Sequence, residues 1–296
     1  MSATYLKALK TVAVVCLILL SSFQVACTEN SKNKTVSVEE PVISEDKPVI
    51  SEDMFRIKRL PHAQTITLGD HSLAEWDSSF IVMKVPSQQA FQLQWKTIKG
   101  HAPDPLSQND IDLTVYMARD NDYWYVALEA MDDSVLASPA PHPYGGDCLE
   151  VFFAGKALDA PMDMHRHVAT PSSRDQAAFL QLVLPAAPLD APDHYFPGHR
   201  TDSTFIRNAT RFGFMTSIWR TASGWSAEAR IPFAAFEPEV LSRINGHQPL
   251  KMNIDYPDYD ESLAPAIGYK PDNVFCLDDD EKHVNVPGFM RSVTFE

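Results

Sequence analysis

Hydrophobic and polar residues alternate with a period of two along several short stretches of this chain. Such alternation is typical of β-strands with one buried and one exposed face. The stretches 113–117 and 123–128 are joined by a polar turn at 120–122, which predicts a β-hairpin. A second hairpin is predicted for 212–219 and 225–231, with a turn at 221–224. Further strands are predicted at 148–153, 179–184, 250–256 and 291–295.

Helical periodicity is thin and is confined to the short segment 233–241. The 22 prolines and 11 glycines lie mostly between the predicted strands, where they favour turns. This pattern predicts an all-β fold, specifically a two-sheet antiparallel β-sandwich of the immunoglobulin or jelly-roll kind. Two long connections, 154–178 and 185–211, have no predicted structure of their own and are either functional loops or decoration.

The first 26 residues have the pattern of a secretory signal. Lys7 and Lys10 precede the apolar run 11–23, which is shorter than the ~20 apolar residues that span a membrane. Small residues then lead to Cys27, in a pattern that resembles the lipobox of bacterial lipoproteins. We therefore expect a lipoprotein signal peptide at 1–26 and a lipid anchor on Cys27. An ordinary signal cleavage nearby and an uncleaved anchor are the alternatives.

Two residues beside Cys27 refine this expectation. Gln24 departs from the lipobox, which usually has an aliphatic residue at that position. Thr28 follows the cysteine where retained lipoproteins carry Asp, and this resemblance implies sorting to the outer membrane if the host is Gram-negative. Two acyl chains on Cys27 would hold the protein at a lipid bilayer, since one chain binds only marginally.

The segment 27–53 predicts a disordered acidic tether. It is poor in aromatic residues and contains a tandem repeat, PVISEDK followed by PVISED, at 41–53. Such a segment cannot bury enough apolar surface to offset its chain entropy. The remaining residues, 54–296, suit one β-sandwich domain.

The formal net charge of −14 narrows the choice of partners. An acidic chain is a poor ligand for nucleic acid and for anionic lipid headgroups, so we expect neither as a partner. After removal of the signal and lipidation of Cys27, Cys148 and Cys276 remain. An exported protein allows a disulfide between them, but a buried free thiol at Cys148 is equally consistent with its apolar strand.

The motifs of common enzymes are absent from the sequence. It contains no GxSxG, Walker, Rossmann-glycine or HExxH pattern, so we expect no catalytic activity. Acidic pairs and runs such as Asp132-Asp133 and 278–280 offer oxygen ligands for a structural calcium ion, and no other metal or cofactor is expected. A haem-binding electron-transfer sandwich is an alternative function, because axial haem ligands could come from the cluster of Met162, Met164, His165 and His167.

Glu150 is the polar residue within the apolar strand 148–153. Burying a carboxylate without partners is costly. Either it pairs with an arginine such as Arg230, or its face of the strand borders a water-filled cleft. Tyr144 would then lie at the edge of that cleft. An aromatic ring beside a carboxylate suits a sugar, because the ring covers C–H groups while the carboxylate accepts hydroxyl hydrogens.

Five segments resemble, in the same order, those of carbohydrate-binding module family 9. They are 66–76 (ITLGDHSLAEW), 113–132 (LTVYMARDNDYWYVALEAMD), 146–153 (GDCLEVFF), 223–233 (SGWSAEARIPF) and 286–295 (VPGFMRSVTF). The resemblance covers most of 54–296. It implies a β-sandwich that binds the ends of oligosaccharides or polysaccharides without catalysis.

The resemblance also implies the residues of the binding site. The strand glutamate of the family corresponds to Glu150, and one of its two clamping aromatic residues corresponds to Tyr144, close to Asp147. The second aromatic position falls near His283, where better-known members carry tryptophan, and an arginine position falls near Leu180. We expect carbohydrate contacts from Tyr144, Asp147, Glu150 and His283.

The sequence therefore predicts an exported, membrane-anchored lipoprotein that captures carbohydrate while glycoside hydrolases, as partners, carry out hydrolysis. Two alternatives belong to other classes. One is the haem-binding sandwich, and the other is a structural envelope lipoprotein that has no glycan site.

Overall fold

The computed structural model describes ten parts of the chain. All of them lie within one compact unit, Lys47–Glu296. Among these residues, no helix combines the length and apolarity needed to cross a membrane. Cys27, the expected signal peptide and the expected tether lie outside the described residues. The described parts are 54–62, 64–85, 111–137, 143, 145–156, 178–189, 194–196, 201–259, 273–276 and 290–296.

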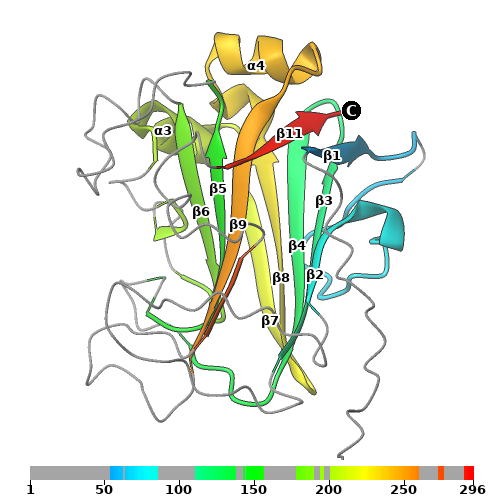
Figure 1. The fold of residues 1–296 in the computed structure, drawn as a ribbon, viewed down its shortest axis with the longest axis vertical. Helices are drawn as coiled ribbons and strands as arrows, with labels where there is room; N and C mark the ends of the chain where they lie inside the picture. The colour runs from blue at the N-terminus through cyan, green and yellow to red at the C-terminus, as the bar shows by residue number, and fades with distance from the viewer. Residues whose placement is uncertain are drawn as a thin grey trace, which may run out of the picture. The chain divides into compact units, whose positions relative to one another are not determined.

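Most of the described structure is β-strand, so the prediction of an all-β fold is confirmed (Figure 1). Eight of the strands fall where alternation predicts them, whereas β1, β2 and β10 were not predicted. The strands are β1 (Met54–Arg59), β2 (Ile81–Val85), β3 (Ile111–Arg119), β4 (Tyr123–Asp132), β5 (Cys148–Ala154), β6 (Phe179–Pro185), β7 (Met215–Thr221), β8 (Gly224–Pro232), β9 (Leu250–Asp258), β10 (Asn273–Cys276) and β11 (Arg291–Phe295).

The strands form one 11-stranded sheet, in the order β6-β5-β9-β11-β1-β3-β4-β8-β7, with β10 on β9 and β2 on β3. Strand β1 joins its two halves. Its residues 54–57 pair in parallel with β11, and Lys58 and Arg59 pair in parallel with β3. The expectation of two separate, wholly antiparallel sheets is modified accordingly. The short strand β1 has only Phe55 and Ile57 as buried alternating residues, too weak a pattern to predict this connection.

The two halves of the sheet contribute to one hydrophobic core. Val151 on β5 and Ile254 on β9 belong to the same cluster as Val126 on β4 and Ala227 on β8. The ring of Trp124 lies 5.7 Å from that of Phe153 in the other half. Because full burial of one large apolar side chain contributes about 1.5–3 kcal/mol, this core dominates the stability of the fold.

Two short α-helices accompany the sheet in the described part of the chain. Helix α3 (Ser203–Arg211) lies in the connection 185–211, for which the expectation of no regular structure is wrong. Asp202 caps it by accepting hydrogen bonds from the backbone N–H groups of Thr204 and Phe205. Only Phe205 and Ala209 are buried, so its apolar stripe is too short to detect by periodicity.

The predicted helical segment 233–241 is divided in the structure. A single 3-10 turn, η3 (Phe233–Ala235), comes first, and helix α4 (Pro238–Asn245) follows it. Proline favours the first turn of a helix, where its missing N–H group has no helical partner, and this sets the start of α4. A second 3-10 turn, η1 (Ser78–Phe80), precedes β2.

A second apolar cluster covers the other side of β3, β4 and β8. Trp76, Phe80 and Tyr125 belong to it. The indole Nε1–H of Trp76 donates a 2.8 Å hydrogen bond to Oε1 of the buried Glu228 on β8. This bond connects two of the segments that carry the family resemblance, 66–76 and 223–233. Burial raises the pKa of Glu228 to about 7; the bond from Trp76 opposes this rise, and the carboxylates of Glu75 and Asp70 add to it.

Cys148 is a free, buried thiol, so the disulfide alternative with Cys276 does not hold in this structure. Burial raises the pKa of the Cys148 thiol well above its ordinary value.

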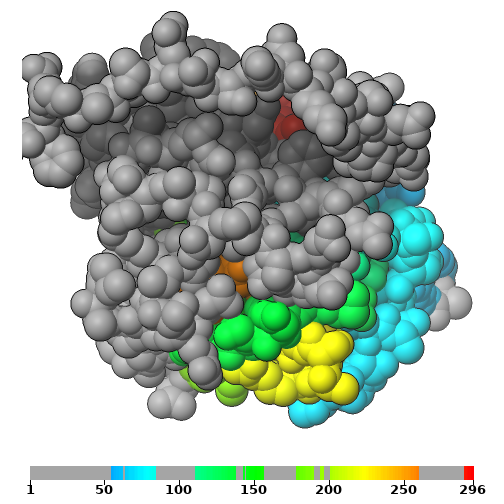
Figure 2. Space-filling view, turned by 60° about the horizontal axis from the view of Figure 1, so that its bottom comes forward, coloured from blue at the N-terminus to red at the C-terminus, as the bar shows by residue number. Residues whose placement is uncertain are grey.

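The turn between β7 and β8 packs tightly against the end of β4. The backbone N–H of Asp132 donates to the carbonyl of Ser223 at 2.9 Å. On the outer side of the hairpin, the ring of His71 stacks on Trp219 with 5.5 Å between centroids. Figure 2 shows the hairpin in yellow between the green strands and the cyan N-terminal segment.

Gly224 allows this close approach, which makes Gly224→Ala a test of the packing. An added Cβ would lie 2.1 Å from the carbonyl oxygen of Ala130, so backbone would have to move. We expect the free energy of unfolding, measured with urea, to fall by about 1–3 kcal/mol. Gly69→Ala is the control, because Gly69 has a φ of +93° but no atom within 4 Å of the added Cβ. A loss at Gly224 no larger than the loss at Gly69 would contradict the steric argument.

Glu228→Gln should make the stability less dependent on pH. The pKa of Glu228 is raised from 4.5 to about 7 in the folded chain, so the folded state holds its proton more tightly than the unfolded state. The contribution of this carboxyl to stability is therefore fully present below pH 4.5 and is lost as the pH rises to about 7, by at most about 3 kcal/mol. Melting temperatures of both proteins between pH 4 and pH 8 give the measurement. Parallel curves for Glu228→Gln and the parent would show that the carboxyl titrates normally.

Candidate functional site

Alternation along β5 directs its side chains to two opposite sides of the sheet. Leu149, Val151 and Phe153 point into the main core, and all three are fully buried. Glu150 and Phe152 therefore project from the opposite side of the strand. Because β6 and β9 flank β5 on both sides (Figure 1), this opposite side extends across three paired strands.

The strand register gathers four polar side chains on that side. Glu150 lies opposite Asp255 of β9, and Phe152 lies opposite both Gln181 of β6 and Asn253 of β9. Directly opposed residues project to the same side of a sheet. We call Glu150, Gln181, Asn253 and Asp255 the β5 polar cluster. Glu150 is half-buried, and the other three are buried.

Each amide of the cluster donates to a carboxylate. Nε2 of Gln181 donates to Oε1 of Glu150 at 2.9 Å, and Nδ2 of Asn253 donates to Oδ1 of Asp255. Hydrogen bonds to a charged acceptor are stronger than neutral ones, so they orient both amides. An amide that turns its nitrogen to a carboxylate directs its carbonyl oxygen elsewhere.

Within the described part of the chain, these two carbonyl oxygens have no hydrogen-bond partner. Oε1 of Gln181 and Oδ1 of Asn253 are both shielded from solvent, and the side chains are 1% and 0% exposed. An unsatisfied buried acceptor costs about 1–3 kcal/mol. Two such acceptors beside two carboxylates need a physical explanation, for which a bound water, an ion or the hydrogen-bond donors of a ligand are candidates.

Apolar side chains border the β5 polar cluster. Phe152, Ala154, Phe179 and Met290 form a separate small cluster on this side. The rings of Phe152 and Phe179 have centroids 6.4 Å apart. Both rings are buried, so among the described residues they support the polar groups rather than present an open surface.

The structure rules out Arg230 as the partner of Glu150. The expected partner Arg230 lies on β8, where its guanidinium is 4.6 Å from the ring centroid of Tyr123 and its Nε donates to the carbonyl of Gly213. Pairing between Glu150 and Arg230 is therefore wrong. Gln181 is a partner that the sequence reasoning missed.

Leu180, where the resemblance puts an arginine, does not reach this site. Its side chain is buried in the main core, and the neighbouring Gln181 lies on the Glu150 side instead. The signal was present in the sequence, because Gln181 is the polar residue of the apolar stretch 179–184. Asn253 and Asp255 carried a similar signal, since a spacing of two puts both on one side of a strand.

Several expected ligand residues lie outside the described residues. Tyr144 and His283 are among them, so their carbohydrate contacts stay predictions. The same holds for the methionines and histidines of the haem alternative at 162–167 and for the acidic run 278–280.

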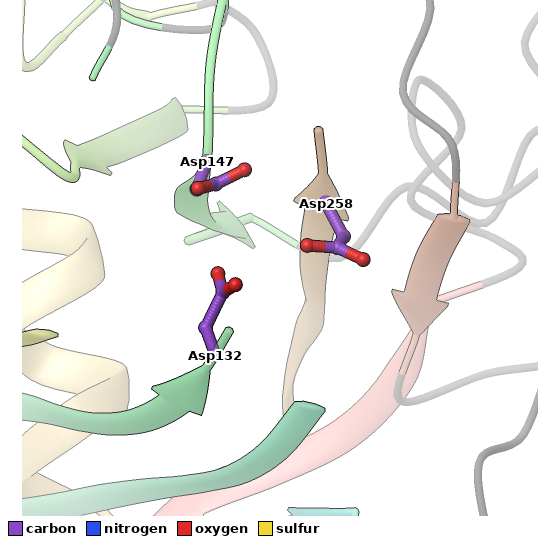
Figure 3. Close-up of side chains that lie close together, drawn as sticks. All are labelled: Asp132, Asp147 and Asp258. Carbon is purple, nitrogen blue, oxygen red and sulfur yellow. The ribbon is translucent and has the colours of Figure 1, made fainter. Parts of the chain in front are cut away.

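Asp147 lies in a different cluster from Glu150. Its carboxylate gathers with those of Asp132 and Asp258, and their ligand atoms all lie within 4.8 Å of one another. Figure 3 shows the three side chains converging from the end of β4, the start of β5 and the end of β9. All three are buried. A carbohydrate contact by Asp147 stays a prediction.

Backbone groups hold this carboxylate cluster in place. The N–H groups of Leu136 and Tyr259 both donate to Asp147. Burial raises the pKa of Asp147 to about 9, and the nearby carboxylates of Asp132 and Asp258 raise it further while the two backbone bonds oppose the rise. The hydroxyl of Tyr256 donates to Oδ2 of Asp132 at 3.4 Å.

The carboxylate cluster is the group among the described residues that could hold a metal ion. Three carboxylates this close repel one another, and either a shared proton or a cation relieves the repulsion. Carboxylate oxygens are the ligands that Ca²⁺ prefers. Asp132, one of the residues expected to bind calcium, belongs to the cluster, whereas its expected companion Asp133 is exposed and does not.

No protein-family model matches the chain, and no curated protein sequence does. Among solved structures it is similar to a carbohydrate-binding module of family 9 from Caldicellulosiruptor kristjanssonii in complex with cellotriose, with a TM-score of 0.48 and 11% identity over 82% of this chain and 93% of that one. A family 9 module from the same organism in complex with glucose gives a TM-score of 0.45 and 11% identity over 82% of this chain and 95% of that one. A presumed carbohydrate-binding protein from Bacteroides uniformis gives a TM-score of 0.46 and 13% identity over 82% of this chain and 99% of that one. At these scores and identities, the comparisons assign no role to any residue of this chain.

Calcium should stabilise the protein through the carboxylate cluster. With a dissociation constant of about 0.1–1 mM, as in extracellular modules, 10 mM Ca²⁺ would add roughly 1.4–2.7 kcal/mol. We expect the melting temperature of EDTA-treated protein at pH 8 to rise with added Ca²⁺. The rise should be smaller at pH 5, because protons compete for the carboxylates.

Asp132→Asn separates this effect from general salt effects. The variant has one charge fewer in the cluster, and its amide can still pair with Ser134 and Tyr256. Without calcium it should be at least as stable as the parent at pH 8, because repulsion decreases. With calcium it should gain less. An equal response of both proteins to Ca²⁺, or no response by the parent, would rule out a calcium site here.

Proposed function

We propose that this chain binds carbohydrate without catalysis, at the side of β5, β6 and β9 that carries the β5 polar cluster. The observation that supports it is the pair of buried, unpartnered carbonyl oxygens of Gln181 and Asn253 next to the carboxylate of Glu150. Sugar hydroxyls are hydrogen-bond donors and acceptors in close array, so one ring could satisfy several of these oxygens together. The resemblance of Glu150 to the strand glutamate of family 9 points to the same ligand class.

The remaining parts of the proposal rest on the sequence alone. Tyr144 and His283 would supply the flat surfaces that cover the apolar face of a sugar ring, and Glu150 would orient the ring through its hydroxyls. The bound ligand would be an oligosaccharide or the end of a polysaccharide. Export and a lipid anchor on Cys27 would hold the protein at a membrane, where glycoside hydrolases act on the same glycan.

Glu150 alone contributes too little free energy for millimolar binding of a sugar. Millimolar binding requires about 4.1 kcal/mol, and a hydrogen bond to a charged group contributes about 1.5–3 kcal/mol. Glu150 therefore needs the two amide oxygens, an aromatic surface, or both. The ligand would occupy the cluster as a unit rather than contact a single carboxylate.

Titration calorimetry of the purified full-length chain with glucose and cellotriose tests this proposal. We expect Glu150→Gln to weaken binding by roughly 10- to 100-fold, because it removes the charge that strengthens the hydrogen bonds. Tyr144→Ala should weaken binding by a similar factor through loss of the ring surface.

Glu129→Gln is the matched control, since Glu129 is an exposed glutamate on β4, in the other half of the sheet. Its affinity should equal that of the parent. Absence of sugar binding by the parent would refute the proposal. So would unchanged affinity in both Glu150→Gln and Tyr144→Ala when melting curves show that all variants are folded.

A further inference from the structure

We infer that the segment 64–80 is a pH-sensitive clasp, which closes over one side of β3, β4 and β8 while Glu228 is protonated and opens locally when Glu228 ionises. We call this segment the Trp76 loop. It packs against strands of the other half of the sheet from the β5 polar cluster, so the inference does not depend on carbohydrate binding. It follows from how the loop is attached and from what surrounds Glu228.

The Trp76 loop is fixed firmly at its two ends. Before it, the backbone N–H of Leu60 donates to the carbonyl of Arg119 on β3 at 2.7 Å. After it, β2 pairs with β3 in an antiparallel ladder. The loop between these two attachments can therefore open while the strands on both sides of it stay in place.

One side-chain hydrogen bond joins the loop to β8. It is the 2.8 Å bond from Nε1 of Trp76 to Oε1 of Glu228. Among the described residues, the other hydrogen bonds made by side chains of the loop stay within it. For example, the backbone N–H of Thr67 donates to Oε1 of Glu75, and Nε2 of Gln64 donates to the carbonyl of Glu75. Opening the loop therefore costs few hydrogen bonds.

Apolar packing supplies the rest of the attachment. Ile66, Trp76 and Phe80 are buried in the second apolar cluster. The rings of Trp76 and Tyr116 of β3 have centroids 5.8 Å apart. The main core is far larger than this cluster, so local opening exposes less apolar surface than global unfolding and requires less free energy.

The carboxyl of Glu228 is poorly suited to carry a charge. The side chain is 0% exposed, and its register neighbours Ala127 on β4 and Ser217 on β7 are uncharged. Its Oε2 is shielded from solvent and has no hydrogen-bond partner within the described part of the chain, and the same holds for Oε2 of Glu75 in the loop. A buried carboxylate with one hydrogen bond costs more free energy than the neutral acid.

The cations on this side of the sheet do not compensate Glu228. Lys58 lies on β1, which β3 and β4 separate from β8. The guanidinium of Arg230 lies over the ring of Tyr123, and its Nε donates to the carbonyl of Gly213. Strand β7 contributes no ionisable side chain here. The ionisable residues on this side, from β1, the loop, β3, β4 and β8, are Lys58, Asp70, His71, Glu75, Asp77, Asp112, Tyr116, Tyr123, Tyr125, Glu129 and Arg230.

These surroundings set the pH range of the clasp. Burial raises the pKa of Glu228 from 4.5 to about 7; the bond from Trp76 opposes the rise, and Glu75 and Asp70 add to it. In the open loop, water reaches the carboxyl and its pKa returns toward 4.5. The closed state therefore holds the proton more tightly. Its advantage is fully present below pH 4.5 and is lost as the pH rises to about 7.

Hydrogen exchange of the purified full-length chain, followed by mass spectrometry at pH 5 and pH 8, tests the inference. After correction for the intrinsic exchange rate at each pH, we expect the protection of peptides from 64–80 to be roughly 10- to 100-fold lower at pH 8. Peptides from β5 report global unfolding. The loop should exchange faster than they do at both pH values, because its opening is local.

Three variants identify the titrating group. Glu228→Gln should remove the fall in loop protection, because the amide stays uncharged and its oxygen can still accept from Trp76. Glu75→Gln should make the fall smaller, because it removes a neighbouring negative charge. His71→Asn is the control for the side chain type that usually titrates in this range. It should keep the parent's ratio of protection between the two pH values.

Each contrary outcome overturns the inference. Equal loop protection at pH 5 and pH 8 would show that no clasp titrates. Loop peptides that exchange no faster than β5 peptides would show that Glu228 acts on global stability alone. A fall that persists in Glu228→Gln, or that disappears in His71→Asn, would place the titrating group elsewhere.

Discussion

The register of β5 between β6 and β9 is the constraint on which both the core and the candidate site depend. A strand paired on both edges cannot slide without breaking two ladders of hydrogen bonds. A slip by one residue would bring Glu150 into the core and turn Leu149 and Val151 outward. Burying that carboxylate without a partner would cost several kcal/mol in addition to the lost apolar burial. The apolar residues of β5 therefore position its glutamate, and the same register aligns Gln181, Asn253 and Asp255 with it.

The carboxylates of Glu228, Asp147 and the half-buried Glu150 have three different surroundings, and the difference distinguishes structural roles from the proposed ligand-binding role. Glu228 accepts a hydrogen bond from Trp76, which joins the N-terminal segment to β8. Asp147 accepts two backbone N–H groups and shares its place with two other aspartates, so its surroundings suit a proton or a cation. Glu150 accepts from a side-chain amide whose own carbonyl remains unpartnered. Among the described residues, Oε2 of Glu228 is also without a partner, but the third arrangement has unpartnered amide oxygens on two neighbouring strands, and this is the reason for proposing a ligand there.

Much of the fold could be predicted because long strands alternate clearly. The predicted strand 291–295 matches β11, and 148–153 matches β5 to within one residue. The apolar run of β2 and the four residues of β10 are too short or too uniform for a pattern to appear. The site was harder to predict because it depends on register. Glu150 could be recognised within one strand, but its partners belong to other strands. The carboxylate cluster joins residues 132, 147 and 258, and no local pattern indicates that these strand ends meet.

The unpartnered carbonyl oxygens of Gln181 and Asn253 lower the stability of the folded chain, but they would favour the proposed binding of a ligand. The amide nitrogens of Gln181 and Asn253 stabilise the carboxylates of Glu150 and Asp255 through charge-assisted hydrogen bonds. The same two amides bring with them carbonyl oxygens that have no partner among the described residues, and each of these carries a free-energy cost. The large core shared by the two halves of the sheet makes this cost tolerable, because it stabilises the fold without any contribution from the opposite side of β5. A ligand that donates to both oxygens would regain the cost on binding. The same local instability that marks the site would then contribute to its affinity.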